Sequence, residues 1–282
     1  MKDISKMRMG QIIYANSWPL FYQLERSLPS TYEMIRDIPV SLNRMLASGE
    51  LDVSGISSFS YGQYADDYIL LPELSVGSVG EVNSILLFSK EPLEKVRPRT
   101  VSLSSSSATS VNLLKIMMQL RYDCLPEYDV SSQSLEQMLS QSDAALLIGD
   151  PAIVAARKYK QLHIVDLGAA WHEWTGLGMT YAVVAARKQA YLQQKPLLEQ
   201  LHEALLINKT RNSKDLSAII NDACLQLGGD RAYWTRYFSC LQFDFNEQLQ
   251  EGLALYYRYA QQLGFLSSAV PLTFLNDKLP NR

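Results

Sequence analysis

The sequence predicts an α/β protein of two lobes with a ligand cleft between them. Strand-like and helix-like runs alternate in the order β-α-β-α-β from Met9 to Ser57, and a second series of this kind spans roughly residues 91–178. The apolar run Met179–Lys188 then resembles a strand that returns to the first series. Two such lobes, joined by two crossing segments, place a cleft at the carboxyl ends of both sheets, where small ligands commonly bind.

The first series contains three expected strands and two expected helices, and its order predicts a mostly parallel sheet. The strands are "MGQIIYA" (9–15), "YEMIRDI" (32–38) and "LDVSGIS" (51–57). We expect one continuous helix over "SWPLFYQLERSL" (17–28), which opens at Ser17 with Pro19 in its first turn. A second helix is expected over "PVSLNRMLASGE" (39–50), with Ser41 as its N-cap and Gly49 as its C-terminal stop.

The second series predicts the other lobe. The strand "VNSILLFSK" (82–90) is expected just before this series, whose own expected strands are "TVSLS" (100–104), "DAALLIGD" (143–150) and "LHIVDL" (162–167), and whose expected helices are "SVNLLKIMMQLRY" (110–122), "SLEQMLSQS" (134–142) and "PAIVAARKY" (151–159). Helical segments follow the returning strand at about 190–207, 213–228, 230–240 and 247–264. We expect residues 1–90 and 179–282 to form lobe I and residues 91–178 to form lobe II.

Composition excludes several classes of function. The chain has 282 residues, of which 47% are hydrophobic, so it can bury a substantial core. A net charge of −3 provides no basic field for nucleic acid or an acidic membrane. No apolar run is long enough to span a membrane, and no secretion signal is recognisable, so we expect a cytoplasmic protein. The three cysteines and three histidines show no metal-ligand spacing, which predicts no metal site.

The stretch "VSLSSSSATSVNLLKIMMQL" (101–120) places a run of hydroxyl side chains between a strand and a helix. The residues at this junction are Ser105, Ser106, Ser107, Thr109 and Ser110. A helix N-terminus offers free N–H groups and a favourable dipole, and short hydroxyl side chains add donors for a carboxylate or phosphate. We interpret the junction as an anion site; the alternatives are an N-cap without a ligand or a simple linker.

Six segments, taken in order, resemble the chorismate dehydratases of the futalosine route to menaquinone. They are "IIYANSWPLFYQL", "LASGELDVSGISSFSYG", "YILLPELSVGSVGEVNSILLFSK", "SATSVNLLKI", "ALLIGDPA" and "DLGAAWHEWTGLGMTYAV". The likeness runs from about residue 9 to residue 187 and is weaker beyond. A related enzyme of the same pathway, 1,4-dihydroxy-6-naphthoate synthase, shares the fold. The resemblance implies a fold like that of type II periplasmic binding proteins.

This resemblance implies that the substrate is chorismate, which loses water to give 3-[(1-carboxyvinyl)oxy]benzoate. The reaction implies no redox cofactor and no metal, because aromatisation of the ring supplies the driving force. The protein must then bind, orient and assist proton movement. The naphthoate-forming reaction and the binding of a small anion without catalysis remain the alternatives.

The resemblance and the strand ends together select the candidate site residues. Asn16 is the leading catalytic candidate, as an orienting amide; its alternative role is an Asx turn or cap before the first helix. Asp150 could protonate the departing hydroxyl or could cap the helix that follows. Candidate substrate-binding residues are Ser17, Ser57, Ser58, Ser84, Ser106, Ser107, Thr109, Ser110, Thr175 and Gly176. For Ser84, pairing within the sheet is the alternative, because the register of its strand is open.

Overall fold

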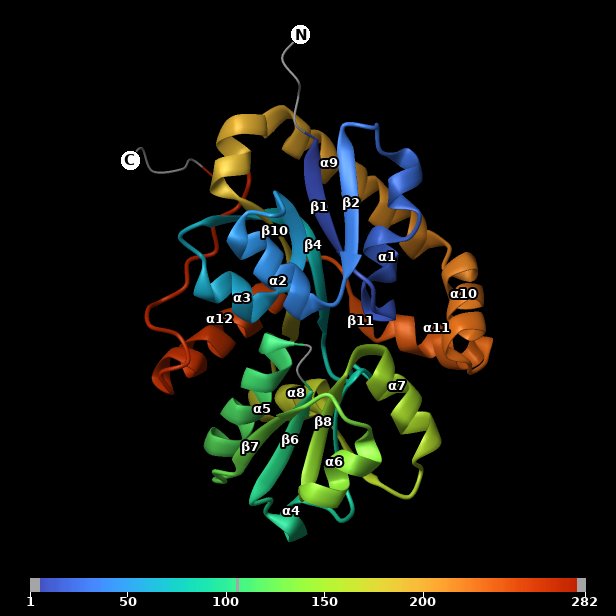
Figure 1. Ribbon diagram of the computed structural model, residues 1–282, viewed down its shortest axis with the longest axis vertical. Coiled ribbons are helices and arrows are strands. Elements are labelled where there is room, and N and C mark those ends of the chain that lie inside the picture. Colours follow the sequence, from blue (N-terminus) through green and yellow to red (C-terminus); the bar gives the residue numbers. More distant parts are fainter. Residues whose placement is uncertain (1–5, 105–106, 278–282) are drawn as a thin grey trace.

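A computed structural model describes residues 6–104 and 107–277, which form two lobes, each built on one β-sheet (Figure 1). The first and last described residues both belong to the upper lobe, lobe I in Figure 1, and the middle of the chain forms lobe II. The two-lobed arrangement agrees with the predicted fold class.

Lobe I contains a mixed six-stranded sheet. Its strand order is β11 (Leu241–Gln242), β4 (Tyr68–Ser78), β10 (Met179–Arg187), β3 (Val53–Ser57), β1 (Met7–Ile12) and β2 (Tyr32–Asp37). Strand β1 pairs in parallel with β2 and β3, whereas β10 is antiparallel to both β3 and β4. The expectation of a mostly parallel sheet therefore holds for the first three strands only, because β10 returns from lobe II in the opposite direction.

The helices of lobe I cover its sheet and include a C-terminal group. They are the 3₁₀ helices η1 (Ala15–Ser17) and η2 (Leu24–Ser27), and α1 (Trp18–Phe21), α2 (Pro39–Ser48), α3 (Ser58–Gln63), α9 (Lys188–Lys214), α10 (Ser217–Leu227), α11 (Arg231–Ser239) and α12 (Glu247–Gln262). Helices α9 to α12 pack on lobe I (Figure 1).

Two local predictions in lobe I were wrong. The expected helix over residues 17–28 is broken into α1 and η2, because Gln23 adopts a left-handed conformation with φ 56°. The N-cap of α2 is Ile38, and the Ser41 hydroxyl donates instead to a carboxylate oxygen of Asp37 at 2.6 Å. Gly49 does end α2 in the left-handed conformation that favours glycine.

Lobe II contains a five-stranded sheet in the order β7 (Glu127–Ser131), β6 (Thr100–Ser104), β8 (Ala144–Ile148), β5 (Ile85–Ser89) and β9 (His163–Asp166). Its helices are α4 (Leu93–Val96), α5 (Ala108–Leu120), α6 (Leu135–Gln141), α7 (Gly149–Lys158) and α8 (Leu167–Thr175). Strand β5 pairs with β8 and β9 in lobe II. The sheets therefore divide between β4 and β5, one strand earlier than the boundary expected after Lys90.

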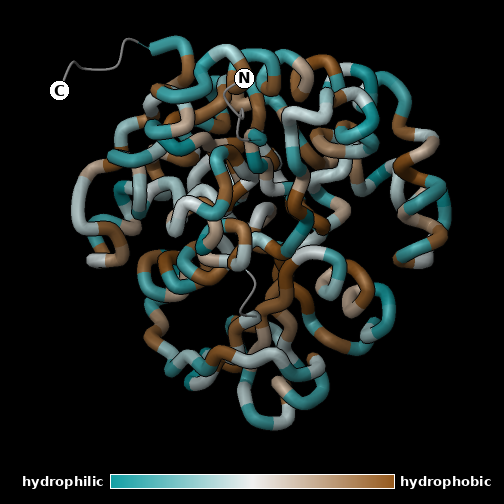
Figure 2. Tube along the Cα trace, turned by 45° about the horizontal axis from the view of Figure 1, so that its top comes forward, coloured by the Kyte–Doolittle hydropathy of each residue, from teal (hydrophilic) through white to brown (hydrophobic). Residues whose placement is uncertain are grey.

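Apolar side chains form the interior of both lobes and continue across the contact between them. In Figure 2, hydrophobic segments run through the middle of each lobe and hydrophilic segments lie mostly at the outside. One buried cluster joins residues of lobe I, such as Ile12 and Ile56, to residues of lobe II, such as Ile148 and Leu113. Within the described residues, no helix is long and apolar enough to cross a membrane.

Candidate functional site

Four strand ends meet at the contact between the lobes. Strand β1 leads into η1 and β3 leads into α3 in lobe I, while β6 precedes α5 and β8 leads into α7 in lobe II. The small cleft between them is lined by Ile12, Tyr14, Asn16, Pro39, Ser57, Ile85, Ser107, Ser110, Ile148, Gly149, Tyr181 and Ala182. The predicted junctions therefore converge on one cleft.

Asn16 lies in η1 with its side chain at the cleft. Its Oδ1 atom is buried and has no hydrogen-bond partner among the described residues. A buried amide oxygen without a partner costs free energy that a ligand donor can recover. This geometry does not match the alternative role of an Asx turn or cap, because the side chain of Asn16 makes no such bond in the described structure.

Ser57 ends β3 and acts as the N-cap of α3. Its Oγ accepts a hydrogen bond from the Ser60 backbone N–H at 3.2 Å and from Nδ2 of Asn43 at 3.0 Å. Its backbone N–H donates to Oδ1 of Asn43, also at 3.0 Å. Ser57 is thus held firmly where it lines the cleft.

Ser107 and Ser110 lie on the opposite side of the cleft, at the N-terminus of α5. Ser107 is the N-cap, and its Oγ accepts from the Ser110 backbone N–H at 3.4 Å. Helix α5 has 13 residues, so its dipole places positive potential at the cleft. Ser105 and Ser106, which we included in the predicted anion site, lie outside the described residues.

Thr109 and Ser58 join the two lobes and do not line the cleft. The Oγ1 of Thr109 in α5 accepts from the Phe59 backbone N–H at 3.0 Å, and it lies 3.2 Å from the Ser58 hydroxyl oxygen. The Ser58 hydroxyl also donates to the Thr180 carbonyl at 2.7 Å. These two residues, predicted to bind substrate, form a hydrogen-bonded contact between α3 and α5.

Asp150 makes a second contact between the lobes. It stands in the first turn of α7, after the N-cap residue Ile148, so it is not the N-cap. Its Oδ1 accepts from the Ala15 backbone N–H of η1 at 2.9 Å. Burial raises the pKa of the Asp150 carboxyl to about 6, and the Ala15 hydrogen bond offsets part of this effect. The carboxyl therefore contacts Ala15, the residue before Asn16, and can be protonated near neutral pH.

The cleft is uncharged and closed. The described residues that line it include no lysine, arginine, histidine or carboxylate, so hydroxyl groups, amides and the α5 N-terminus are their polar groups. Its volume is only about 30 Å³, whereas sites for small ligands usually measure about 300–1,000 Å³. A ligand of that size can enter only if the lobes move apart. Among the described residues, no cluster of three or more His, Cys, Asp or Glu side chains could hold a metal ion.

The other predicted residues lie away from the cleft lining. The Ser17 hydroxyl donates to the carbonyls of Ile12 and Tyr14, which holds the turn at η1. The buried Ser84 hydroxyl donates to the Val82 carbonyl at 3.3 Å in the crossing segment. Thr175 bonds back to the Trp171 carbonyl, and Gly176 ends α8 with φ 73°. Each of these four residues has a local structural role in the described conformation.

Comparisons with known proteins agree with this geometry. Residues 7–262 match the family described as "Menaquinone biosynthesis". The chain belongs to the menaquinone biosynthesis family. Over 213 residues it is 35% identical to the chorismate dehydratase of Thermus thermophilus. The matched region covers 70% of this chain and 75% of that protein. It is also 27% identical over 185 residues to the 1,4-dihydroxy-6-naphtoate synthase of the same organism, over 64% of this chain and 66% of that protein.

The fold of this menaquinone biosynthesis family member is that of periplasmic binding proteins. The periplasmic aliphatic sulphonate-binding protein of Escherichia coli superposes with a TM-score of 0.67 and 11% identity, over 99% of this chain and 96% of that one. At that identity the likeness concerns the fold alone. It confirms the two-lobed class that the sequence predicts.

Several lining residues of this family member were missed by sequence reasoning. Gly149 has φ 64°, and a Cβ there would lie 2.7 Å from the Tyr14 ring, so glycine permits the close approach of α7 to η1. Tyr181 forms part of the wall, with its hydroxyl 2.9 Å from that of Ser78. The sequence "GDP" directly after an apolar strand is the signal that points to Gly149 as a turn residue. Tyr181 has no such signal, because in the sequence it looks like an ordinary strand residue.

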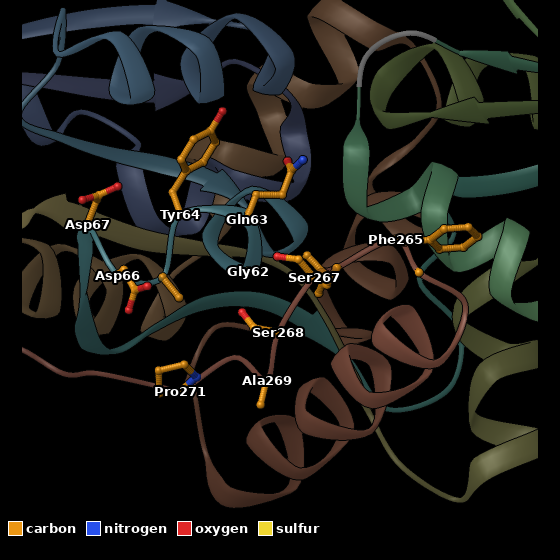
Figure 3. A pocket seen from close by; sticks show the side chains of 13 residues that line it. Gly62, Gln63, Tyr64, Asp66, Asp67, Phe265, Ser267, Ser268, Ala269 and Pro271 are labelled. Carbon is orange, nitrogen blue, oxygen red and sulfur yellow. The ribbon is translucent and has the colours of Figure 1, made fainter.

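A larger hollow on the described surface lies elsewhere. It has a volume of about 470 Å³ and lies between the end of α3 and the segment after α12 (Figure 3). Asp66, Asp67, Ser267 and Ser268 are among the residues that surround it. It contains none of the strand-to-helix junctions, so we place the functional site in the smaller cleft between the lobes.

Proposed function

We propose that this protein is a chorismate dehydratase, a hydro-lyase that converts chorismate to 3-[(1-carboxyvinyl)oxy]benzoate and water. The observation that carries this proposal is the uncharged cleft, in which the unpartnered Asn16 Oδ1 faces hydroxyl groups and the N-terminus of α5. Such a cleft suits an elimination that needs orientation more than a strong base. The 35% identity to a chorismate dehydratase supports the choice of substrate.

Substrate binding in this proposal uses the groups on both sides of the cleft. Chorismate carries two carboxylates, and the lining formed by residues 6–104 and 107–277 contains no cationic side chain to hold them. The N-terminus of α5, with Ser107 and Ser110, would receive one carboxylate through N–H groups and hydroxyls. The hydroxyl of Ser57 would donate to a second oxygen from the lobe I side.

The elimination removes a proton from ring carbon 3 and hydroxide from ring carbon 4, so that the products are an aromatic ring and one water molecule. The Asn16 amide is too weak a base to take the proton by itself. In our proposal the substrate's own enolpyruvyl carboxylate takes it, and Asn16 orients that group. Asp150, whose pKa burial raises to about 6, does not line the closed cleft; in our proposal it reaches the leaving hydroxide and protonates it only when the lobes have separated to admit the substrate, and the substrate carboxylate then returns the ring proton to it.

The test is incubation of purified protein with chorismate, without added cofactor and in the presence of a chelator. We expect the loss of chorismate and the appearance of the aromatic ether, separated by liquid chromatography and identified by mass. Heat-denatured protein is the control for the spontaneous reaction. Recovery of intact chorismate from folded protein would contradict the proposal.

The 27% identity to a 1,4-dihydroxy-6-naphtoate synthase makes that reaction the second candidate. Its substrate would be the cyclised futalosine product. Consumption of that compound with chorismate left intact would decide for the second candidate. Unchanged recovery of a bound compound in both assays would instead indicate a binding protein without catalytic activity.

A further inference from the structure

Asn43 makes two hydrogen bonds to Ser57 whose directions are fixed by chemistry. The Ser57 backbone N–H can only donate, so the Asn43 atom that lies 3.0 Å from it must be the acceptor, Oδ1. The other end of the same amide, Nδ2, then faces Ser57 Oγ at 3.0 Å and must donate to it. Asn43 lies in α2 and does not line the cleft.

The Ser57 oxygen consequently has both of its acceptor positions filled. One is taken by Nδ2 of Asn43 and the other by the Ser60 backbone N–H at 3.2 Å. Its remaining group is the hydroxyl hydrogen, for which no acceptor is found among residues 6–104 and 107–277. Because Ser57 lines the cleft, that hydrogen is available to a ligand bound there.

We infer that Asn43 is a positioning residue, which holds the Ser57 hydroxyl as a hydrogen-bond donor toward an oxygen of the substrate. A serine hydroxyl can usually rotate between donor and acceptor orientations, but here a rotation would break a bond that Asn43 or Ser60 donates. The donor is therefore oriented before the substrate arrives, which lowers the cost of binding a carboxylate or ether oxygen. This inference rests on the proposed function, because it takes the occupant of the cleft to be chorismate.

The test is a double-mutant cycle with Asn43→Ala and Ser57→Ala, read by kcat, by KM for chorismate and by the Kd of the product 3-[(1-carboxyvinyl)oxy]benzoate. We expect Asn43→Ala to raise KM and Kd about tenfold, the usual effect of losing a hydrogen bond to a charged group, and to change kcat less. In the Ser57→Ala background, the same change should alter Kd less than about twofold. Arg44→Ala, next to it on α2 and paired with the exposed Glu50, is the matched control and should leave Kd unchanged.

A merely structural role for Asn43 would raise Kd by the same factor in both backgrounds, and that result would overturn the inference. If Asn43→Ala does not fold, Asn43→Asp replaces it. The introduced carboxylate keeps the shape and the bond from the Ser57 N–H, but it accepts the hydroxyl hydrogen and so turns it away from the cleft. A Kd effect of this variant that does not shrink in the Ser57→Ala background would also overturn the inference.

The two proposals fail in different ways. Wild-type protein that binds the product but leaves chorismate intact would reject the dehydratase assignment, and the cycle measured by Kd would still test Asn43. Wild-type protein that turns over chorismate, with additive effects of the two substitutions, would reject the role of Asn43 alone. Wild-type protein that neither binds nor converts these compounds would reject both.

Discussion

At the scale of single residues, neighbouring polar side chains around the cleft are paired differently. Ser17 and Ser58 are fully buried, and their hydroxyls donate to backbone carbonyls. Asn16 Oδ1 is buried without a partner, although an unsatisfied polar atom costs about 1–3 kcal/mol. An oxygen that stabilises nothing in the closed protein is better explained by a bound ligand than by the fold.

Asn16→Ala should therefore abolish most of the turnover of chorismate without destabilising the protein. The change removes an amide that makes no hydrogen bond within the described protein, so we expect the melting temperature to stay within about 2 °C. We expect kcat to fall by about a hundredfold or more, because orientation of the reacting group is lost. Normal turnover by folded Asn16→Ala protein would remove Asn16 from the catalytic site.

Asp150→Asn should stabilise the protein at pH 8 and have little effect on its stability at pH 4. The folded-state pKa of Asp150 is raised from 3.8 to about 6, so the protonated form is the one that folding favours. Stability from this group is complete below pH 3.8 and is lost as the pH rises through 6, by at most about 3 kcal/mol. Asparagine keeps an oxygen for the Ala15 N–H and removes the buried charge.

The measurement for Asp150→Asn is chemical unfolding of both proteins at pH 4 and pH 8, together with kcat. We expect kcat to fall about a hundredfold if the carboxyl supplies the proton to the leaving hydroxide. A variant that is no more stable than the wild type at pH 8 would show that burial of the Asp150 charge does not destabilise the protein.

At the scale of elements, most strands and helices were predicted from the sequence, but β4, β7, α3 and α8 were not. Strand β4 was not predicted, because Pro72 and Glu73 interrupt its apolar run and both residues argue against a central strand. The structure accommodates them in an irregularity of the β4 and β10 pairing, where Glu73 has φ 59°. The returning strand β10 was predicted, since its apolar run has no such interruption.

The candidate site was predicted in part for a related reason. Junctions between strands and helices can be located from sequence, and Asn16, Ser57, Ser107 and Ser110 do line the cleft. Sequence does not show which side chain of a junction turns inward. Thr109 thus faces the other lobe, one residue away from Ser110, which faces the cleft.

Asp166 is an element-scale feature that sequence reasoning did not single out. Its carboxylate accepts from the Gly168 and Ala169 N–H groups at the start of α8, and from the Val82 and Asn83 N–H groups in the crossing segment. One side chain thus fixes a helix start to the segment that joins the lobes. Its role combines an N-cap with a tertiary anchor.

Asp166→Ala should lower the free energy of unfolding by about 2–4 kcal/mol, because it leaves these backbone N–H groups without their acceptor. Urea unfolding followed by circular dichroism measures the change. Asp143, which accepts N–H groups of Arg99 and Thr100 at an exposed edge of lobe II, offers the matched control. We expect Asp143→Ala to cost less, since water can replace its hydrogen bonds. Equal losses of unfolding free energy in Asp166→Ala and Asp143→Ala would mean that the hydrogen bonds from Asp166 to the crossing segment add no stability.

At the scale of the whole molecule, hydrogen bonds on two sides of the cleft hold the lobes together. Asp150 accepts from Ala15 on one side, and Thr109 accepts from Phe59 on the other. Helix α12 supports the second contact, since the Tyr256 and Tyr257 hydroxyls donate to the carbonyls of Thr109 and Ser58. The closed cleft of about 30 Å³ follows from these contacts, and they must separate for a substrate to enter.

Thr109→Val should shift the protein toward an open form, because valine has the shape of threonine but cannot accept from the Phe59 N–H. In the closed form that N–H would lose its partner, whereas in the open form water can bind it. We expect a shift of about 1.4 kcal/mol, or tenfold in the equilibrium between the two forms. Small-angle X-ray scattering should show a larger radius of gyration for the variant, and KM for chorismate should rise.

Thr109→Ser is the control, because it restores the oxygen and should return both measurements toward the wild-type values. A radius of gyration that does not change in Thr109→Val, with an unchanged KM, would show that this contact does not determine closure. A raised KM with an unchanged radius of gyration would return Thr109 to the role first predicted for it, direct contact with the substrate. Closure and direct binding are therefore separated by the same pair of variants, since only closure changes the dimensions of the protein without ligand.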